Sequence, residues 1–358
     1  MNTAGSKGSF QAGRRRSRHL DLDHGRVEMS QGAGGRAMAD LIDLMFRRAF
    51  DNPLLDQAND QASFEVAAGR MVMSTDSFVI SPLFFPGGNI GSLAVHGTVN
   101  DLAMAGAQPL YLSAGFILEE GLPLAELARI VAAMADAARQ AGVLIVTGDT
   151  KVVERGKGDG VFINTAGVGR VPAGLDISGD RARPGDRILL SGTVGDHGMA
   201  IMSLRNGLEF ETALESDCAS LNALVGRMVE AAGGAIHTLR DPTRGGVAAT
   251  LNEIADQSGV GMRLDETAVP VRAEVRGACE LLGLDPLNVA NEGKLIAIVD
   301  PASADALLAA MRQGPEGRDA SIVGEVIEDP LHLVRMVTRI GGERVVDWLH
   351  GEQLPRIC

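Results

Sequence analysis

The chain has 358 residues and a formal net charge of −13, and its residues are 45% hydrophobic but only 3% aromatic. This length is enough for two ordinary domains and a tail, with a core built mainly from aliphatic side chains and methionine. An acidic chain with no long basic run beyond its first twenty residues is not expected to bind duplex nucleic acid. No apolar run is long enough to span a membrane.

Residues 1–24 are predicted to be a disordered leader. The arginine run at residues 14–16 resembles a twin-arginine signal, but the apolar stretch that should follow is missing. The cysteines Cys218, Cys279 and Cys358 are too few for a disulfide framework, and no pair has CxxC spacing. A reducing compartment, the cytoplasm, is therefore expected.

The segment from residue 25 to 178 is predicted to be an α/β domain. A short extended stretch near residue 27 precedes a glycine-rich loop, and strands then alternate with helices. The predicted strands are residues 71–80, 110–118, 143–146 and 161–168. The predicted helices are residues 36–50, 93–106 and 123–141.

A turn signal at residues 183–186 lies near the expected start of a second domain, residues 179–336. Short, separated strands again alternate with helices, which favours an α+β sandwich over a doubly wound sheet. The predicted strands are residues 188–191, 261–264, 295–299 and 321–327. The predicted helices are residues 197–206, 219–232, 246–257, 273–282 and 302–312.

Residues 337–358 are predicted to form a flexible tail that ends in Cys358. Gly341 and Gly342 loosen this segment, and Pro355 keeps the residue before it extended. About sixteen extended residues span roughly 50 Å, so the terminal thiol could reach a distant site. Such a thiol could carry an acyl-type group between active sites, or it could be incidental. The other two cysteines are expected to be core residues.

Three aspartates stand beside glycine, threonine or asparagine near the predicted ends of elements. Asp76 ends a strand, Asp101 follows Asn100 near the start of a helix, and Asp149 follows an apolar strand. Magnesium prefers oxygen ligands, and usually takes one or two carboxylates with phosphates and water. Each aspartate alone could instead cap a helix or a turn. Together they predict a site for magnesium and a nucleotide.

Two glycine-rich segments are candidate phosphate cradles. Residues 241–246 precede a predicted helix, whose N–H groups and dipole favour an anion; a capped turn is the alternative. The loop at residues 32–35 is a weaker candidate, and the P-loop pattern is absent. His96 either lines the nucleotide site or packs in the core. The predicted nucleotide-binding residues are Gly32, Gly34, Gly35, His96, Asn100, Asp241, Thr243, Gly245 and Gly246.

Two further charged residues are candidates for catalysis. Lys151 follows the third aspartate by two positions, so it could neutralise a developing anion or be a solvated charge. Glu292 lies beside a glycine just before a predicted strand. It could act as a general base, although a structural role in a turn is the alternative.

These motifs resemble the HypE family of hydrogenase maturation factors, in the superfamily that includes aminoimidazole ribonucleotide synthetase. The resemblance covers roughly residues 25–358. The terminal PRIC is typical of the HypE branch, whereas the other motifs are typical of the superfamily. The motifs are the glycine loop at 32–35, STDS at 74–77, HGTVNDLA at 96–103, GDTKV at 148–152, DPTRGG at 241–246, NEGK at 291–294 and PRIC at 355–358.

The resemblance implies a two-domain fold, with N-terminal domains that pair into a dimeric barrel-like sheet and nucleotide sites near the interface. It also implies that a carbamoyltransferase, HypF, loads a carbamoyl group onto Cys358. The chain would then dehydrate this thiocarbamate to a thiocyanate with ATP. The cyanide would pass to iron on a complex of HypC and HypD, for the nickel–iron hydrogenase active site.

The same resemblance assigns roles to the candidate residues. The carboxylates Asp76, Asp101 and Asp149 would hold magnesium against the phosphates. Glu292 would take a proton from the carbamoyl nitrogen, and Lys151 would assist by charge or proton transfer.

Two other readings compete with this one. A phosphotransferase of the same superfamily, similar to selenophosphate synthetase or thiamine monophosphate kinase, would act on a free small substrate. A selenophosphate synthetase should carry a reactive cysteine near its glycine-rich segment, and residues 25–40 contain no cysteine. A non-catalytic scaffold that uses ATP as a switch would bind partners without modification of Cys358.

Overall fold

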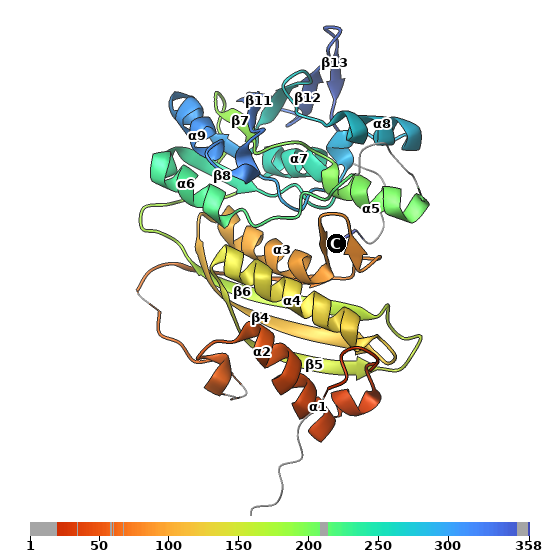
Figure 1. The fold of residues 1–358 in the computed structure, drawn as a ribbon. Helices are drawn as coiled ribbons and strands as arrows, with labels where there is room; N and C mark the ends of the chain where they lie inside the picture. Colours follow the sequence, from red (N-terminus) through yellow and green to blue (C-terminus); the bar gives the residue numbers. More distant parts are fainter. Residues whose placement is uncertain are drawn as a thin grey trace, which may run out of the picture.

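The computed structural model of the chain describes residues 20–33, 35–57, 59, 61–66, 68–207, 214–348 and 357–358. These residues form two α/β halves, each built on its own sheet, and Figure 1 shows one half above the other. The predicted α/β class with two domains is confirmed. None of the helices in the described part of the chain combines the length and apolarity that a membrane span requires.

The N-terminal half is built on a four-stranded sheet with the strand order β1-β6-β4-β5. β4 and β5 are parallel, whereas β6 is antiparallel to both of its neighbours. A parallel pair needs a crossover, and a helix between the two strands supplies it. The strands are β1 (Met71–Phe78), β4 (Gln108–Glu119), β5 (Leu144–Val153) and β6 (Val161–Arg170).

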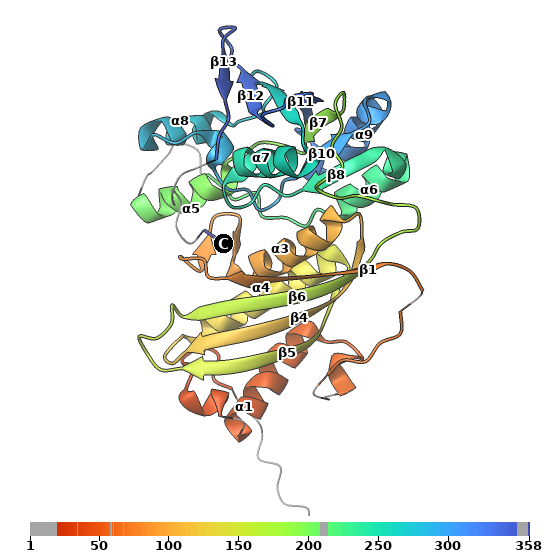
Figure 2. The same cartoon turned by 180° about the vertical axis from the view of Figure 1, so that it is seen from behind.

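Helices α3 (Ile90–Met104) and α4 (Leu124–Ala141) cover one face of this sheet, and Figure 2 shows the opposite face without a covering helix. The start of α3 was predicted three residues too late. The Asn89 side chain accepts hydrogen bonds from the N–H groups of Gly91 and Ser92, which caps the helix before its apolar stretch begins.

Strand β5 is longer than predicted. The sequence suggested a short strand at residues 143–146, but pairing with β4 continues from Leu144 to Val153. The neighbouring strand therefore overrides the glycine and the polar residues that seemed to end it. As a result, Asp149 and Lys151 lie within a strand and not after one.

The helical segment before β1 packs at the β5 side of this half. It consists of α1 (Arg36–Leu41), a π-helical turn (Ile42–Phe46) and α2 (Arg47–Phe50), and it agrees with the helix predicted at residues 36–50. Its Phe46 ring lies 4.6 Å from the ring of Phe116 on β4, measured between centroids.

The C-terminal half is built on a seven-stranded sheet with the order β13-β12-β9-β11-β7-β10-β8. Neighbouring strands are antiparallel except for β12 and β9, which are parallel. The strands are β7 (Arg187–Leu190), β8 (Ile236–Arg240), β9 (Gly261–Asp265), β10 (Ile296–Val299), β11 (Ser321–Ile327), β12 (Val334–Val337) and β13 (Glu343–Val345).

The sequence did not predict β8, because polar residues interrupt its apolar pattern. His237 and Thr238 are buried there, and each has a partner: Nδ1 of His237 lies 2.7 Å from the Asp186 carboxylate, and the Thr238 hydroxyl donates to the carbonyl of Ser178. Buried polar side chains with partners of this kind are compatible with a buried strand at the edge of the sheet.

The predicted tail begins later than residue 337. Strand β13 pairs with β12, and the following Val346 is buried, with its carbonyl accepting a hydrogen bond from the Asn252 side chain. Gly341, with a φ of 85°, allows the turn between the two strands. Residues 349–356, which include the first two residues of the terminal PRIC motif, lie outside the described residues.

Five helices pack around the second sheet. The start of α6 differs from the prediction by three residues, because Asn100 of α3 holds the preceding loop: its side chain donates to the carbonyl of Ala219 and accepts from the N–H of Leu221. This contact also joins the two halves. The described helices are α5 (Asp196–Asn206), α6 (Asn222–Ala232), α7 (Gly246–Ser258), α8 (Ala273–Leu282) and α9 (Ala304–Met311).

Candidate active site at the junction of the two halves

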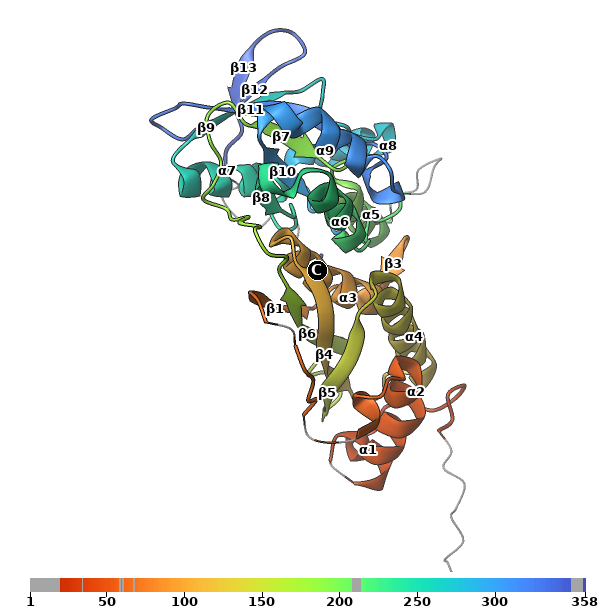
Figure 3. The same ribbon diagram turned by 90° about the vertical axis from the view of Figure 1, so that its left-hand side faces the viewer.

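A cavity of about 510 Å³ lies where the two halves meet. Its wall in the N-terminal half comes from β1 and α3, and its wall in the C-terminal half comes from the segment after β8. The C-terminal end of the chain lies between the halves in Figures 1 and 3. The lining residues with reactive or charged side chains are Asp76, Asp101, Arg240, Asp241, Arg244, Glu292 and Cys358.

Asp76 of β1 and Asp101 of α3 form an acidic pair in this cavity. The helix approaches the strand closely at Gly97, where a Cβ would stand 2.8 Å from the ring of Phe78. The Ser74 hydroxyl donates to Oδ2 of Asp101 at 2.5 Å. Burial, followed by the charge of Asp101, raises the pKa of Asp76 to about 6. A cation placed here would relieve the repulsion between the two carboxylates.

The turn between β8 and α7 depends on two glycines. Gly245 and Gly246 have φ values of 75° and 62°, in the left-handed region. A Cβ on Gly246 would stand 2.5 Å from the carbonyl oxygen of Leu287 and 2.6 Å from that of Val289. Any larger residue at this position would therefore displace the start of α7.

This turn brings Asp241 and Arg244 to the cavity. Burial raises the pKa of Asp241 to about 7, and the charge of Asp101 adds to the effect. Arg244 is exposed at the cavity and lowers the pKa of the acidic groups around it, including Asp76. The cavity therefore holds a surplus of acidic groups beside one exposed guanidinium. Sequence reasoning did not single out Arg244, although it lies inside a quoted motif.

Glu292 lies at the same cavity with only 4% of its surface exposed. Its Oε1 has no hydrogen-bond partner among the described residues. Burial raises the pKa of Glu292 well above its usual value, and the charges of Asp217 and Asp241 raise it further. A buried carboxylate with an unpartnered oxygen is costly unless a ligand uses it. This combination of burial and raised pKa suits a proton acceptor.

Asp217 fixes the backbone on which Glu292 stands. Its two carboxylate oxygens accept hydrogen bonds from the N–H groups of Glu292, at 3.1 Å, and Gly293, at 3.3 Å. The ammonium of Lys294 lies 3.4 Å from the same carboxylate. No local pattern marks Asp217 in the sequence, because it reaches the site from the loop between α5 and α6.

Cys358 ends the chain inside the cavity. The N–H of Val79 donates to the Cys358 oxygen at 3.1 Å, and the preceding Ile357 is buried in the core of the N-terminal half. Burial raises the pKa of the Cys358 thiol to about 12, and the charge of Glu292 contributes to the rise. A docked thiol with this pKa is a poor nucleophile. The docked position therefore suits a Cys358 sulfur that already carries a group better than a free thiol that has yet to be loaded.

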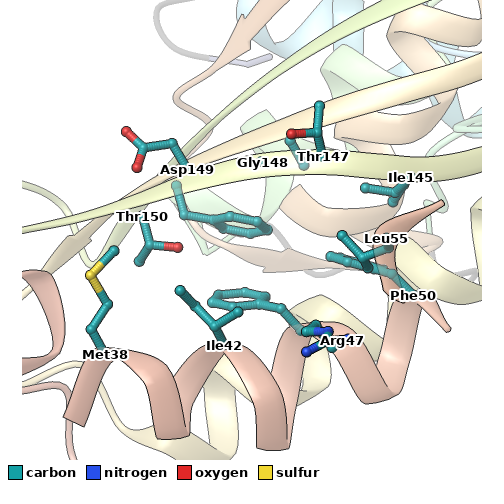
Figure 4. Close-up of a pocket in the computed structure, with 13 residues that line it drawn as sticks. Met38, Ile42, Arg47, Phe50, Leu55, Ile145, Thr147, Gly148, Asp149 and Thr150 are labelled. Carbon is teal, nitrogen blue, oxygen red and sulfur yellow. The ribbon is translucent and has the colours of Figure 1, made fainter. Parts of the chain in front are cut away.

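Within one chain, Asp149 and Lys151 do not line the larger cavity. They form an exposed ion pair at 2.7 Å on β5, and Lys151 lowers the pKa of Asp149. Asp149 borders a second, mostly apolar cavity of about 140 Å³, in which Thr150 of β5 faces Met38 and Ile42 of the helical segment, whereas the Asp149 carboxylate points away from that segment (Figure 4).

The strand register explains why the three aspartates do not converge within one chain. Asp149 shares a row across the sheet with Gly115, Asn164 and Ser77, so its side chain projects from the same, uncovered face as that of Ser77. Asp76, one position away in β1, projects from the opposite face. In the described part of the chain, no group of three His, Cys, Asp or Glu side chains is arranged to hold a metal ion.

Several predicted nucleotide-binding residues have other contacts in this structure. His96 Nδ1 lies 2.6 Å from the Ser220 hydroxyl, and burial lowers the pKa of His96 to about 4. Asn100 binds the loop before α6, as described above. Both side chains therefore join the two halves in a single chain.

The glycine loop at residues 32–35 lies beside β5 and not at the larger cavity. A Cβ on Gly32 would stand 2.6 Å from the backbone nitrogen of Val152, so a close approach of two backbones explains this glycine. Gly35 has open space around it and precedes α1. Gly34 lies outside the described residues. Thr243 lines the larger cavity.

Comparisons with known proteins agree with this architecture. The family models "AIR synthase related protein, N-terminal domain" and "AIR synthase related protein, C-terminal domain" match residues 58–171 and 183–336. The chain is 67% identical over 342 residues to carbamoyl dehydratase HypE of Cupriavidus necator, covering 95% of this chain and 97% of that protein.

Two solved structures are also similar. One is described as hydrogenase maturation protein HypE in complex with ATP; it has a TM-score of 0.89 and 55% identity, covering 92% of this chain and 99% of that one. Another is described as a HypE–HypF complex, with a TM-score of 0.77 and 49% identity over 86% of this chain and 99% of that one. These matches confirm the two-domain fold that the sequence resemblance implied.

Proposed function

Since the chain belongs to the HypE family of hydrogenase maturation proteins, we propose that it dehydrates a carbamoyl group carried on the sulfur of Cys358. ATP drives the reaction, the product is a thiocyanate, and its cyanide supplies the ligands of a nickel–iron hydrogenase active site. One observation carries the residue assignment: the Cys358 sulfur and the buried carboxylate of Glu292 line the same cavity.

The chemistry explains why this pair is needed. Loss of water from S–CO–NH2 requires a better leaving group than hydroxide, and transfer of the γ-phosphoryl group to the carbonyl oxygen provides one. ADP leaves in that step, and a nitrogen proton leaves with it. Breaking the C–O bond then releases phosphate with the second nitrogen proton and forms S–C≡N. The balance is thiocarbamate and ATP to thiocyanate, ADP, phosphate and one proton.

Glu292 is the proposed acceptor of the first nitrogen proton. Its pKa is raised by burial first and then by neighbouring carboxylates, and a general base works best with a pKa near the working pH. Its Oε1 lacks a hydrogen-bond partner within the described chain, which leaves it available to the substrate nitrogen. Arg244 is proposed to compensate the negative charge of the transferred phosphoryl group.

Magnesium is proposed to bind at Asp76 and Asp101. Two carboxylates with phosphate oxygens and water form a ligand set that magnesium commonly takes. The pKa of Asp76 is raised by burial first and then by the charge of Asp101, and a cation would offset that charge. Bound there, the ion would neutralise phosphate charge. Of the predicted nucleotide contacts, Asp241 and Thr243 line the same cavity, and Gly245 and Gly246 follow them at the start of α7.

A homodimer is proposed to bring Asp149 and Lys151 into the reaction. Both stand on the uncovered face of the N-terminal sheet, together with apolar Met73 and Ile117, which are 73% and 45% exposed. Pairing two such faces would bury these side chains and close the sheets into a barrel-like arrangement. The predicted metal ligand Asp149 and the predicted catalytic Lys151 would then act from the partner copy, beside the glycine loop of residues 32–35.

The further partners are proposed from the relatives. HypF is the proposed donor that loads the carbamoyl group, as one solved relative is a HypE–HypF complex. A complex of HypC and HypD is the proposed acceptor of the cyanide. The proposed compartment is the cytoplasm, where a terminal thiol stays reduced. A phosphotransferase that acts on a free substrate is less well supported, because Cys358 occupies the cavity where that substrate would bind.

The test is the intact mass of the protein after incubation with the carbamoyltransferase, carbamoyl phosphate and MgATP. A carbamoyl adduct should form and then lose the mass of one water, only when ATP is present. A Cys358→Ala protein should show neither change. Absence of any adduct, with the transferase shown to be active, would remove Cys358 as the carrier.

A further inference from the structure

The last two residues of the chain are held by both halves of the molecule. Nε2 of His197 lies 2.6 Å from the carbonyl oxygen of Ile357, and the N–H of Val79 donates to the Cys358 oxygen at 3.1 Å. His197 belongs to α5 in the C-terminal half, whereas Val79 follows β1 in the N-terminal half. The tail end thus lies between the halves, as Figure 3 shows.

The hydrogen bonds around His197 define its tautomer. The Ile357 carbonyl can only accept, so Nε2 carries the proton and Nδ1 is the acceptor. The hydroxyl of Ser216, 2.8 Å from Nδ1, must then donate to it, and its oxygen accepts the N–H of Cys218 at 3.1 Å. In this series of hydrogen bonds, each group can donate or accept in only one way. His197 is fully buried, so this arrangement is not shared with solvent.

The same part of α5 is fixed to the segment that carries Glu292. The N–H of Gly195 donates to the Asn291 side chain at 2.7 Å, and the N–H of Gly198 donates to the carbonyl of Ala290 at 3.1 Å. These two contacts flank His197 on both sides. The position of His197 is therefore tied to the residues immediately before Glu292.

A second connection runs through the loop between α5 and α6. Ser216, which binds the His197 ring, is followed by Asp217, which accepts the N–H groups of Glu292 and Gly293. Two adjacent residues thus contact the tail-binding histidine and the backbone of the proposed base. A shift of one without the other would break several buried hydrogen bonds, each costly to lose.

We propose that His197 is a positioning residue for the dehydration: it binds the backbone of the docked tail and, through Ser216 and Asp217, sets the group on Cys358 against Glu292. This inference rests on the proposed function. The contact is made to the Ile357 carbonyl and not to the sulfur, so His197 can hold the tail whether or not the sulfur carries a carbamoyl group. Accurate placement of a reacting group is worth large factors in rate.

A purely structural histidine is the alternative, and the same half contains one for comparison. His237 is also buried, and its Nδ1 bonds to Asp186 in the second sheet, but it does not line the cavity. Replacement of His237 by Phe should lower stability without touching the tail. It is therefore the matched control for His197→Phe.

The test uses the full chain, loaded on Cys358 by the carbamoyltransferase, and follows a single turnover with MgATP by intact mass. His197→Phe should lose its water at least about ten-fold more slowly than the native protein, as expected for loss of one buried hydrogen bond and its alignment. His197→Gln, whose amide N–H can still donate to the Ile357 carbonyl, should recover much of the rate. His237→Phe should match the native rate.

A second measurement follows the tail without any turnover. Alkylation of Cys358 by iodoacetamide, located by peptide mass, should be at least about ten-fold faster in His197→Phe than in the native chain, because release exposes the thiol. Equal alkylation rates, or equal dehydration rates, would overturn the inference, and so would an equal slowing in His237→Phe. If His197→Phe fails to fold, Ser216→Ala replaces it in both assays with the same expected direction. Should the native chain itself form no thiocyanate, the proposed function fails, whereas the alkylation assay still decides whether His197 holds the tail.

Discussion

The carboxylate of Glu292 lies close enough to the thiol of Cys358 for its charge to raise the pKa of that thiol, although Glu292 stands just before β10 and Cys358 is residue 358. The tail therefore delivers its sulfur to a buried carboxylate. Any group carried on that sulfur enters the same field.

Replacement of Glu292 by Gln should stop dehydration and leave carbamoyl loading intact. Loss of a general base typically costs about a hundred-fold or more in rate. The measurement is the single-turnover loss of water from the loaded protein. Glu325→Gln, which removes a carboxylate paired with Arg187 in the second sheet, is the control and should behave as the native chain does. A Glu292→Gln protein that forms thiocyanate at the native rate would remove the base assignment.

The same substitution should change how stability depends on pH. The pKa of Glu292 in the folded chain is raised, mainly by burial, above its unfolded value. The stability contributed by the protonated group is present below the unfolded pKa and is lost as pH rises toward the folded pKa, by up to about 1.4 kcal/mol per pH unit. The stability of Glu292→Gln relative to the native chain, measured by thermal unfolding, should therefore be greater at pH 8 than at pH 5. Parallel pH profiles would contradict this.

Asp217→Asn should move the pH dependence of dehydration. The charge of Asp217 raises the pKa of Glu292, so its removal lowers that pKa. Because the base acts when it is deprotonated, the acidic limb of the rate profile should shift to lower pH. Asp300→Asn, at an exposed turn that caps Ala302, provides the control. An unshifted limb with a reduced rate would assign Asp217 a structural role alone.

Arg244→Ala should lower kcat/KM for ATP by about ten- to a hundred-fold, the range expected when a charge-assisted contact to a phosphate is lost. Arg244→Lys should retain part of the activity. Arg240→Ala offers a comparison, because the Arg240 guanidinium is already bonded to Glu253 at 2.5 Å. Arg240→Ala should therefore lose less activity than Arg244→Ala. Equal losses for the two arginines would indicate a general effect of cavity charge.

Much of the fold followed from the sequence, because apolar periodicity and glycine punctuation are local signals. The strands of the second sheet that were missed, β8, β12 and β13, depend on long-range pairing: His237 in β8 needs Asp186, and β12 pairs with both β9 and β13. No window of sequence around β8 contains the partner that makes a buried histidine acceptable there.

The sequence predicted those residues of the candidate site that lie within short motifs of defined local structure. Asp76, Asp101, Asp241 and Glu292 come from motif segments, and the structure places them around one cavity. Asp149 also lies in a motif, but its direction depends on strand phase, which a shift of one residue reverses. His197 and Asp217 were not singled out, because their roles arise from contacts with segments distant in the chain.

Gly246→Ala should destabilise the chain by on the order of 2–4 kcal/mol, because its φ is left-handed and a Cβ would meet two backbone carbonyl oxygens. Gly277→Ala is the matched control. It lies within α8 with open space at the Cβ position, so it should gain up to about 1 kcal/mol from helix propensity. Chemical denaturation measures both. An equally mild effect at the two positions would show that the turn before α7 can relax.

Asp149→Asn should impair dehydration even though Asp149 lies outside the cavity of its own chain. If two copies share each site, a mixture of Asp149→Asn and Glu292→Gln chains should regain activity that neither has alone, because one site of each mixed dimer is intact. With random reassociation this amounts to about a quarter of the native sites. Mixing Glu292→Gln chains with an Asp149→Asn, Cys358→Ala double variant checks that recovery needs an intact tail, because the site that keeps Glu292 then lacks its own Cys358. No recovery after subunit exchange, shown by mass to be complete, would mean that Asp149 acts within its own chain or through stability alone.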